Sequence, residues 1–229
     1  MSVASVHVGD VGVARALRLL GGPGQVAGLV SSETAVAAPL RSRRIVVPMP
    51  GRVAFIAFWA SDAAFDAFNA THPFARHFHS GWWARLEPSR AFGNWPGLGT
   101  DVPRARTVTS DGPVVVLTLG RLRLRRARPF VRSSRPAEAA AVGAPGFQWG
   151  TALARPPFVS TLSLWESGGA AAAYAYGVDG TAHREAIAAD RQKPFHHRSA
   201  FVRFRVVEVH GSLGGRNPLA EGVLGEVNR

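Results

Sequence analysis

Histidine has the greatest capacity for chemistry in this chain, because its imidazole titrates near neutrality and binds metals. Among the eight histidines, His183 lies in a stretch, residues 182–192, whose pattern predicts a helix. Ala186 and Ile187 follow it at i+3 and i+4, on the same stripe of that helix. Such small and aliphatic neighbours leave room for a flat ligand over the imidazole. A core histidine bonded to a backbone carbonyl is the competing interpretation, and helical position alone favours it.

Two arginines flank this histidine along the predicted helix. Arg184 and Arg191 could hold a carboxylate through paired hydrogen bonds. They could equally be solvated charges on the outer face of the helix, which is the usual state of a single arginine. The sequence therefore defines a candidate site here without deciding between the two roles.

The remaining histidines do not form a recognisable metal motif. His196 and His197 are adjacent, so their side chains point to opposite sides of a strand, and we expect them at the surface or in a loop. His72, His77 and His79 match no compact metal-binding spacing, and no carboxylate accompanies them before Glu87.

Several chemistries are excluded by residue types that the chain lacks. With no cysteine there are no disulfides, thiolate metal ligands, iron–sulfur clusters or cysteine nucleophiles. No Gly-x-Ser-x-Gly elbow is present, and no pair of carboxylates stands in a setting typical of a glycosidase. The glycine-rich residues 211–215 follow a predicted strand but precede no helix pattern, so they do not predict a phosphate cradle.

The formal charge of +12 comes almost entirely from arginine, since Lys193 is the sole lysine among 27 basic residues. Arginines concentrate at residues 41–44 and 121–128, and the second run alternates with leucine, which predicts a strand with a basic outer face. A solvated face is the favoured interpretation, with phosphate, acidic lipid or an acidic protein as alternatives. No specific binding of nucleic acid is expected.

No stretch of the chain has the pattern of a secretory signal or of a membrane span. We therefore expect a cytoplasmic protein. Peripheral contact with a membrane and the oligomeric state are left open.

The elements that position these residues occur twice. Residues 53–61, a strand ending in tryptophan and followed by serine, recur 106 positions later as residues 159–167. Residues 84–86, leading to a glycine, recur 118 positions later as residues 202–204. The second copy thus carries an insertion between its strands, and His183 lies in that insertion. A repeat of this length predicts two copies of one small module rather than a solenoid.

Each copy reads as β-α-β-β-α-β, the order of a ferredoxin-like module. We predict an α+β protein with a first module at residues 1–100, a linker at 101–112, a second module at 113–210 and a C-terminal extension at 211–229. The predicted strands are residues 4–8, 26–31, 52–59, 83–89, 113–122, 147–153, 158–165 and 199–209, and the main predicted helices are 12–20, one beginning at 61 or 62, 128–142, one running from 167 to 176, and 182–192.

One four-stranded sheet leaves a face bare, so we expect the two modules to cover each other as a fused dimeric α+β barrel. Such a pair encloses a cavity between sheets and helices. We expect inward residues of 147–153 and 158–164 to line it, with Trp149 and Phe201 as aromatic walls. A pocket of this kind suits an apolar small molecule.

The second half resembles spheroidene monooxygenase and its relatives. The resemblance is carried by residues 147–153, residues 160–165, His183-Arg184-Glu185-Ala186-Ile187 with Arg191, Phe195, and the closing strand 200–204. In the first half only the architecture agrees. Two departures, Pro194-Phe195 in place of an aromatic pair and His196-His197-Arg198 in place of acidic residues, fall near the expected mouth of the cavity.

This resemblance implies an oxygenase with b-type heme that inserts oxygen into an apolar polyene, with electrons from an acidic ferredoxin-type donor. It implies His183 as the proximal iron ligand, with Arg184, Ile187, Arg191, Trp149 and Phe201 around the cofactor. Gln148, Thr151 and Ser163 are the candidate distal donors for oxygen activation. The alternatives are a heme-dependent dehydratase or peroxidase-like enzyme, a non-enzymatic heme or small-molecule carrier, and a cofactor-free monooxygenase or isomerase in which His183 is a core residue.

Overall fold

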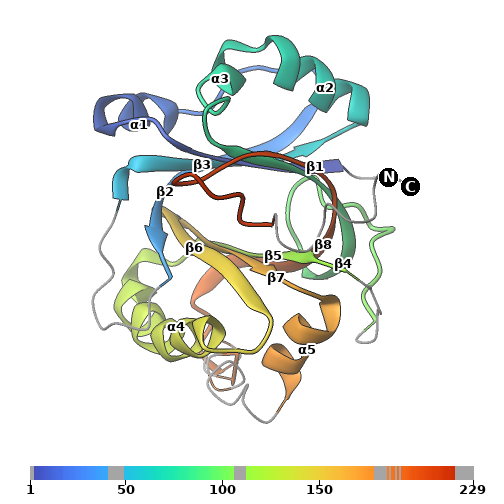
Figure 1. The fold of residues 1–229 in the computed structure, drawn as a ribbon. Coiled ribbons are helices and arrows are strands. Elements are labelled where there is room, and N and C mark those ends of the chain that lie inside the picture. The colour runs from blue at the N-terminus through green and yellow to red at the C-terminus, as the bar shows by residue number, and fades with distance from the viewer. Residues whose placement is uncertain are drawn as a thin grey trace.

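The computed structural model describes residues 3–40, 49–105, 112–177, 185, 187, 188, 190 and 192–219. Eight antiparallel strands form one closed barrel in the order β1-β3-β2-β6-β7-β5-β8-β4. Helices cover the barrel on two opposite sides (Figure 1). The α+β class and the fusion of two ferredoxin-like modules into one barrel are thereby confirmed.

The first module supplies half of the barrel and its upper helical layer. Strand β3 lies between β1 and β2 and is antiparallel to both, which is the split βαβ arrangement. Its elements are β1 (Val3–Asp10), α1 (Val13–Leu19), β2 (Leu29–Pro39), β3 (Met49–Trp59), α2 (Asp62–Thr71), α3 (Pro73–Arg76) and β4 (Trp82–Gly93).

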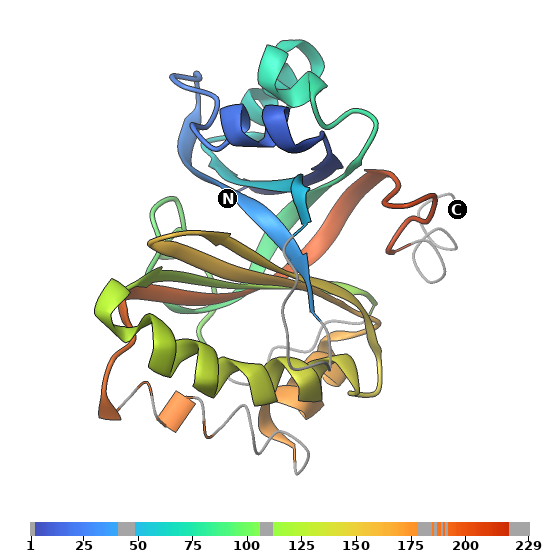
Figure 2. The same cartoon turned by 90° about the vertical axis from the view of Figure 1, so that its left-hand side faces the viewer.

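The second module repeats this order and lies below the first in Figure 1. Its elements are β5 (Val114–Leu122), the 3-10 turn η1 (Leu124–Arg126), α4 (Ala127–Val142), β6 (Phe147–Arg155), β7 (Phe158–Trp165), α5 (Gly168–Tyr176) and β8 (His196–Gly211). The described residues at 185, 187, 188, 190 and 192 are helical. Helix α4 runs across the outer side of this half of the barrel (Figure 2).

Two strand pairs join the modules, and the longer one also extends the second sheet. Strand β2 pairs with β6 over four residue pairs, from Val36 with Ala154 to Pro39 with Thr151. Strand β4 pairs with β8 along most of its length, with register shifts near Leu86 and between Pro88 and Arg90. Because of this pairing, the far end of β4 places residues of the first module beside the second sheet.

The interior of the barrel is a continuous apolar core. Leu153, Phe158, Leu162 and Leu164 are at most 2% exposed and pack with the interior residues of the first module. Native cores are close-packed, so side chains fill the space between the sheets. The side chains of 147–153 and 158–164 that face the barrel interior therefore belong to this core, and the expected cavity between sheet and helices stays a prediction.

The tryptophan–serine repeat is confirmed as a structural repeat. Strands β3 and β7 end at Trp59 and Trp165, and the serines that follow cap the next helices. Ser61 accepts a hydrogen bond from the backbone N–H of Ala64, and Ser167 accepts one from Ala170. These bonds satisfy amides that the first helical turn leaves unpaired.

Two local expectations were wrong. The strand predicted at 26–31 begins at Leu29 and continues as β2 to Pro39. The alternation of arginine and leucine at 121–128 does not form one strand, because β5 ends at Leu122 and helix α4 begins at Ala127. The arginines of this run instead bind neighbouring segments, as Arg121 does with Glu33 and Arg123 with the carbonyl of His196. Within the described residues, no helix has the length and hydropathy needed to cross a membrane.

Candidate functional site

The pairing of residues between strands shows which positions of the two modules correspond. Val3 faces Trp59 in the first module as Val114 faces Trp165 in the second. His7, which is paired with Phe55 and Trp83, therefore corresponds to Thr118, which is paired with Thr161 and Phe201. These residues point away from the barrel interior, toward the helical layers, because their neighbours along each strand belong to the core.

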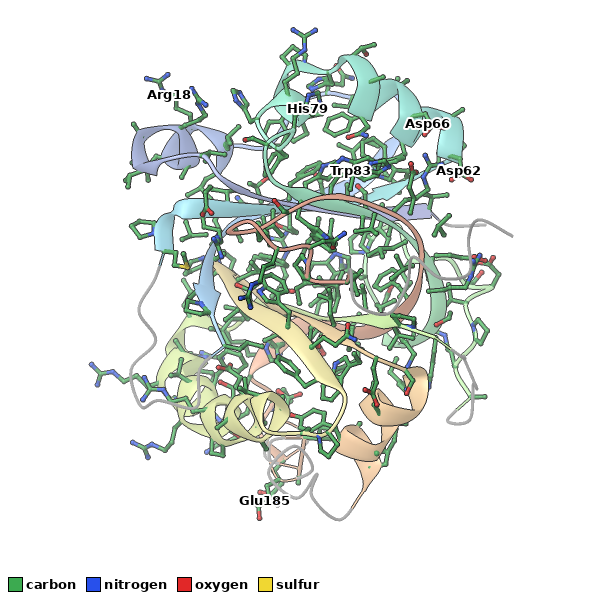
Figure 3. The ribbon with its side chains drawn as sticks, viewed as in Figure 1. Arg18, Asp62, Asp66, His79, Trp83 and Glu185 are labelled. Atoms are coloured by element: carbon green, nitrogen blue, oxygen red, sulfur yellow. The ribbon has the colours of Figure 1, made fainter. Side chains whose placement is uncertain are left out.

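In the first module aromatic rings fill the space between sheet and helices. The ring of His7 is fully buried and lies 5.7–6.2 Å, centroid to centroid, from five aromatic rings. Those rings belong to Phe55, Phe65, Phe68, Phe78 and Trp83. Figure 3 shows Trp83 beneath the helical layer that carries Asp62 and Asp66. This layer is packed and has no room for a ligand.

The corresponding face of the second module is lined differently. Thr118 and Thr161 replace a histidine and a phenylalanine, and their hydroxyls are hydrogen-bonded to each other. Both threonines are only partly buried, and Phe201 is 38% exposed although it stands in the place of Trp83. We call the strip formed by Thr118, Thr161, Ser163 and Phe201 the open face. Three of its four side chains carry hydroxyl groups, and Phe201 supplies its aromatic ring.

Packed clusters bound the open face at both ends of its strands. At one end, Trp165 stacks on Tyr174 of α5 at 5.2 Å, and Tyr174 donates a hydrogen bond to the carbonyl of Ala137 in α4. Burial raises the pKa of the Tyr174 hydroxyl, so this tyrosine stays neutral. At the other end, Phe130, Phe195 and His196 pack together.

His196 is a functional candidate that the sequence did not single out. Its Nδ1 lies 3.3 Å from the carboxylate of Asp190, which also accepts the backbone N–H of Phe195 at 2.8 Å. Burial lowers the pKa of His196, while Asp190 opposes that change. A neutral imidazole that donates through Nδ1 keeps Nε2 as an acceptor, which suits proton transfer. The expectation that both histidines lie at the surface holds for His197, which is exposed, but not for His196.

The position of this imidazole depends on Gly120. A Cβ atom at residue 120 would lie 2.6 Å from Cδ2 and 2.8 Å from Nε2 of His196. We therefore expect Gly120→Ala to displace the ring and to lower the free energy of unfolding by about 1–3 kcal/mol, the usual cost of overpacking. Urea unfolding checks this. Gly9→Ala is the matched control, because the corresponding Cβ in the first module would approach Phe78 only to 3.3 Å. Equal losses in the two variants would contradict the prediction.

Two buried arginines border the open face along its β8 and β4 side. Arg203 is 8% exposed, Arg90 is 4% exposed, and the two pair directly across β8 and β4. Arg90 donates a hydrogen bond to the Tyr176 hydroxyl at 3.0 Å and lies over the ring of Phe92 at 4.4 Å. Burial, and next the charge of Arg90, lower the pKa of Arg203. The two neighbouring guanidinium groups make this edge of the face cationic.

The expected site residues do not gather at one place. Trp149 packs into the barrel core beside Trp82, at 6.4 Å between rings, whereas Phe201 lies on the opposite side of the barrel wall. These two residues therefore cannot wall the same cavity. Ile187 is partly buried in a helical segment. His183, Arg184 and Arg191 lie outside the described residues.

The three candidate distal donors are also separated. Gln148 is exposed at a register shift between β6 and β7. Thr151 is buried, and its hydroxyl donates to the carbonyl of Ala38 at 2.9 Å, which joins the two modules. Only Ser163 belongs to the open face, where its hydroxyl accepts the indole N–H of Trp165 at 3.0 Å.

Fold and register together define a fused dimeric α+β barrel whose two modules line their helix-facing sides with different residues. No protein-family model matches the chain. Spheroidene monooxygenase from Rhodobacter capsulatus is 30% identical over 180 residues, which cover 72% of this chain and 73% of that protein. The chain belongs to the spheroidene monooxygenase family and is an oxidoreductase.

A solved structure shares the fold at much lower sequence identity. Aldoxime dehydratase in complex with butyraldoxime is 9% identical, with a TM-score of 0.53, over 90% of this chain and 79% of that one. This likeness extends to nearly the whole barrel and supports the fold alone.

Proposed function

We propose that this protein is a heme-dependent monooxygenase and that an apolar small molecule is oxidised beside the open face of its second module. Membership of the spheroidene monooxygenase family supports the reaction class and favours a carotenoid-like polyene as the substrate. The location of the reaction is inferred from a difference between the modules. His7, Phe55 and Trp83 of the first module correspond to Thr118, Thr161 and the partly exposed Phe201 of the second. Heme, when bound, supplies the activation of oxygen that side chains alone do not provide.

The residues of the open face fit the requirements of such a cofactor. Phe201 offers an aromatic ring, and Thr118 and Thr161 are smaller than His7 and Phe55 at the corresponding positions of the first module. A porphyrin also carries acidic groups, which the cationic edge at Arg90 and Arg203 would neutralise. His183 is the proposed iron ligand on the strength of the family resemblance. His196, held by Asp190, is placed to accept or return a proton at Nε2.

The packing of the barrel also explains why the reaction would take place at the open face and not inside the barrel. The barrel interior is filled, so a polyene cannot thread through it. On the open face, the ring of Phe201 and the partial burial of the threonines would exclude water from part of the substrate. We propose an external electron donor of the acidic ferredoxin type, for which the arginine-rich surface supplies complementary charge.

The test is reconstitution of the purified protein with hemin, followed by its visible spectrum. We expect wild-type protein to give a Soret band, and His183→Ala to lose or shift it, because an imidazole ligand sets the electronic state of the iron. His196→Ala is the matched control, which keeps the band and its position but slows turnover. A Soret band that is unchanged in His183→Ala and lost in His196→Ala would transfer the ligand role to His196. No band in any of the three proteins would overturn the proposal.

A further inference from the structure

The arginine-rich run at residues 121–135 divides into two sets in the structure. Arg121 and Arg123 bind neighbouring segments of the protein, whereas four later arginines are exposed. These four recur every three or four residues, so they lie on one face of η1 and helix α4. We call this set the arginine ridge, and it consists of Arg125, Arg128, Arg132 and Arg135.

The ridge lies on the side of α4 that faces away from the barrel. Ala137 and Ala141 are the buried residues of this helix, and a turn of about 100° per residue places the ridge nearly opposite to them. Figure 2 shows α4 lengthwise along the outer side of the second module. Leu124 and Val131 are exposed beside the ridge. The outer side of α4 therefore combines positive charge with a small amount of apolar surface.

The charges of the ridge are not neutralised as those of the first module are. Among the described residues, no carboxylate forms an ion pair with the ridge. Burial raises the pKa of Glu138, the only carboxylate of α4, and Arg135 opposes that change. Arg85 of the first module instead pairs with Asp62 and Asp66, which Figure 3 shows on the helical layer of that module. The ridge is thus a cationic surface that an external acidic surface would complement.

The residues of α4 favour an acidic protein over nucleic acid or a membrane. Residues 124–142 contain no asparagine or glutamine to read base edges, and their one aromatic residue, Phe130, packs against the protein. Helices that lie on a membrane bury an apolar face in it, whereas the centre of the exposed side of α4 is charged. Arginine binds carboxylates through paired hydrogen bonds and is enriched at protein interfaces.

The inner side of α4 borders the candidate site. The ring of Phe130 lies 5.1 Å from that of His196, and Nδ1 of His196 is near the carboxylate of Asp190. The ridge is on the other side of the same helix, so about one helix diameter, roughly 10–12 Å, separates it from this cluster. A protein bound to the ridge would therefore stand against the outer wall of the candidate site.

We propose that the arginine ridge of α4 is the docking surface for a carboxylate-rich protein, and that this protein is the electron donor of the reaction. The second part rests on the proposed function, whereas the first part follows from the exposed charges alone. In each turnover the donor gives up two electrons and is oxidised. One atom of O₂ enters a C–H bond of the substrate, and the other leaves as water with two protons from solvent.

Two double variants with the same change in net charge test the docking surface. Arg128→Gln/Arg132→Gln removes two charges from the ridge, and Arg15→Gln/Arg18→Gln removes two exposed charges from α1. The probe is an acidic plant-type [2Fe–2S] ferredoxin, whose affinity is measured by calorimetry at about 0.01 M salt. We expect the ridge variant to bind about threefold to thirtyfold more weakly than wild type, and the α1 variant to bind within about twofold of it. This difference should vanish at about 0.5 M salt.

The same three proteins decide between position, net charge and the class of partner. Melting temperatures within a few degrees of wild type are expected for both variants, because exposed substitutions change stability little. Equal weakening in both variants would show a response to net charge and would overturn the docking surface. Vesicles containing phosphatidylserine and a duplex DNA serve as further probes. If either one binds through the ridge and the ferredoxin does not, the assignment to an acidic protein is wrong.

Reduction of the heme-loaded proteins tests the role of the partner as electron donor. Reduced ferredoxin, below saturation, should reduce the ridge variant about threefold to thirtyfold more slowly than wild type, whereas dithionite should reduce both at the same rate. The shift of the Soret band measures each rate, and the α1 variant should match wild type with both reductants. If ferredoxin reduces all three proteins equally, the donor docks elsewhere and the proposed function stands. If no protein binds heme but ferredoxin still binds through the ridge, the proposed function fails and the docking surface stands.

Discussion

Thr161→Phe is expected to weaken heme binding strongly without unfolding the protein. Thr161 corresponds to Phe55, whose ring fills the space between sheet and helices in the first module. The new ring would occupy the same space on the open face and exclude a flat ligand. Because overpacking a site costs about 1–3 kcal/mol, the affinity for hemin should fall by about tenfold to a hundredfold. Absorbance titration with hemin measures this change.

The control for this variant preserves the volume of the side chain. Thr161→Val removes the hydroxyl that bonds Thr118 but leaves the open face unfilled. It should bind hemin within a few-fold of wild type, whereas Thr161→Phe should melt at an equal or higher temperature and bind hemin about tenfold to a hundredfold more weakly. If Thr161→Phe retained the affinity of wild type, the ligand would lie somewhere other than the open face.

His7→Phe is expected to make the protein more resistant to acid. Burial, with a smaller contribution from His79, lowers the pKa of His7 to about 3 in the folded state. The unfolded chain takes up this proton at the ordinary pKa of about 6.5. As the pH falls below 6.5, the unfolded state therefore binds a proton that the folded state refuses, and the free energy of unfolding drops by about 1.4 kcal/mol per pH unit. Above pH 6.5 the effect vanishes.

The two buried ring nitrogens of His7 also have no hydrogen-bond partner within the described residues. Replacing them with carbon removes about 1–3 kcal/mol of desolvation cost, so the variant should be at least as stable as wild type at pH 7.5. Urea unfolding at pH 7.5 and 4.5 gives the stability difference between the proteins at each pH. That difference should grow by about 2–3 kcal/mol toward pH 4.5, and His197→Gln, at an exposed position, serves as the control. If the stability difference between wild type and His7→Phe stayed constant with pH, His7 would take up its proton equally in the folded and the unfolded state, which would contradict the prediction.

The duplicated pattern predicted most of the fold because its signals are local. A tryptophan at the end of a strand and a capping serine after it occur in both halves, and both define the same strand-to-helix junction in the structure. The extension of β2 to Pro39 was not predictable in this way. Ala35, Ala37 and Ala38 are small because they face a crowded barrel interior, and in the sequence such residues resemble a loop.

The site was harder to predict because it depends on which side of the wall each residue faces. Trp149 and Phe201 both looked like cavity walls, yet the barrel closure places one inside and the other outside. The arginine pair arises only from the register of β4 on β8, which shifts between Pro88 and Arg90. Gly120 and Asp190 acquire their roles from His196, which packs against one and bonds the other.

The location of the bound iron tests this account most directly. Crystals of the heme-reconstituted protein, measured at the iron absorption edge, give the position of the metal from its anomalous signal. We predict one peak on the helix-facing side of the second sheet, above the strip formed by Thr118, Thr161 and Phe201. A peak inside the barrel, on the His7 side of the first module or at the outer surface would contradict the account.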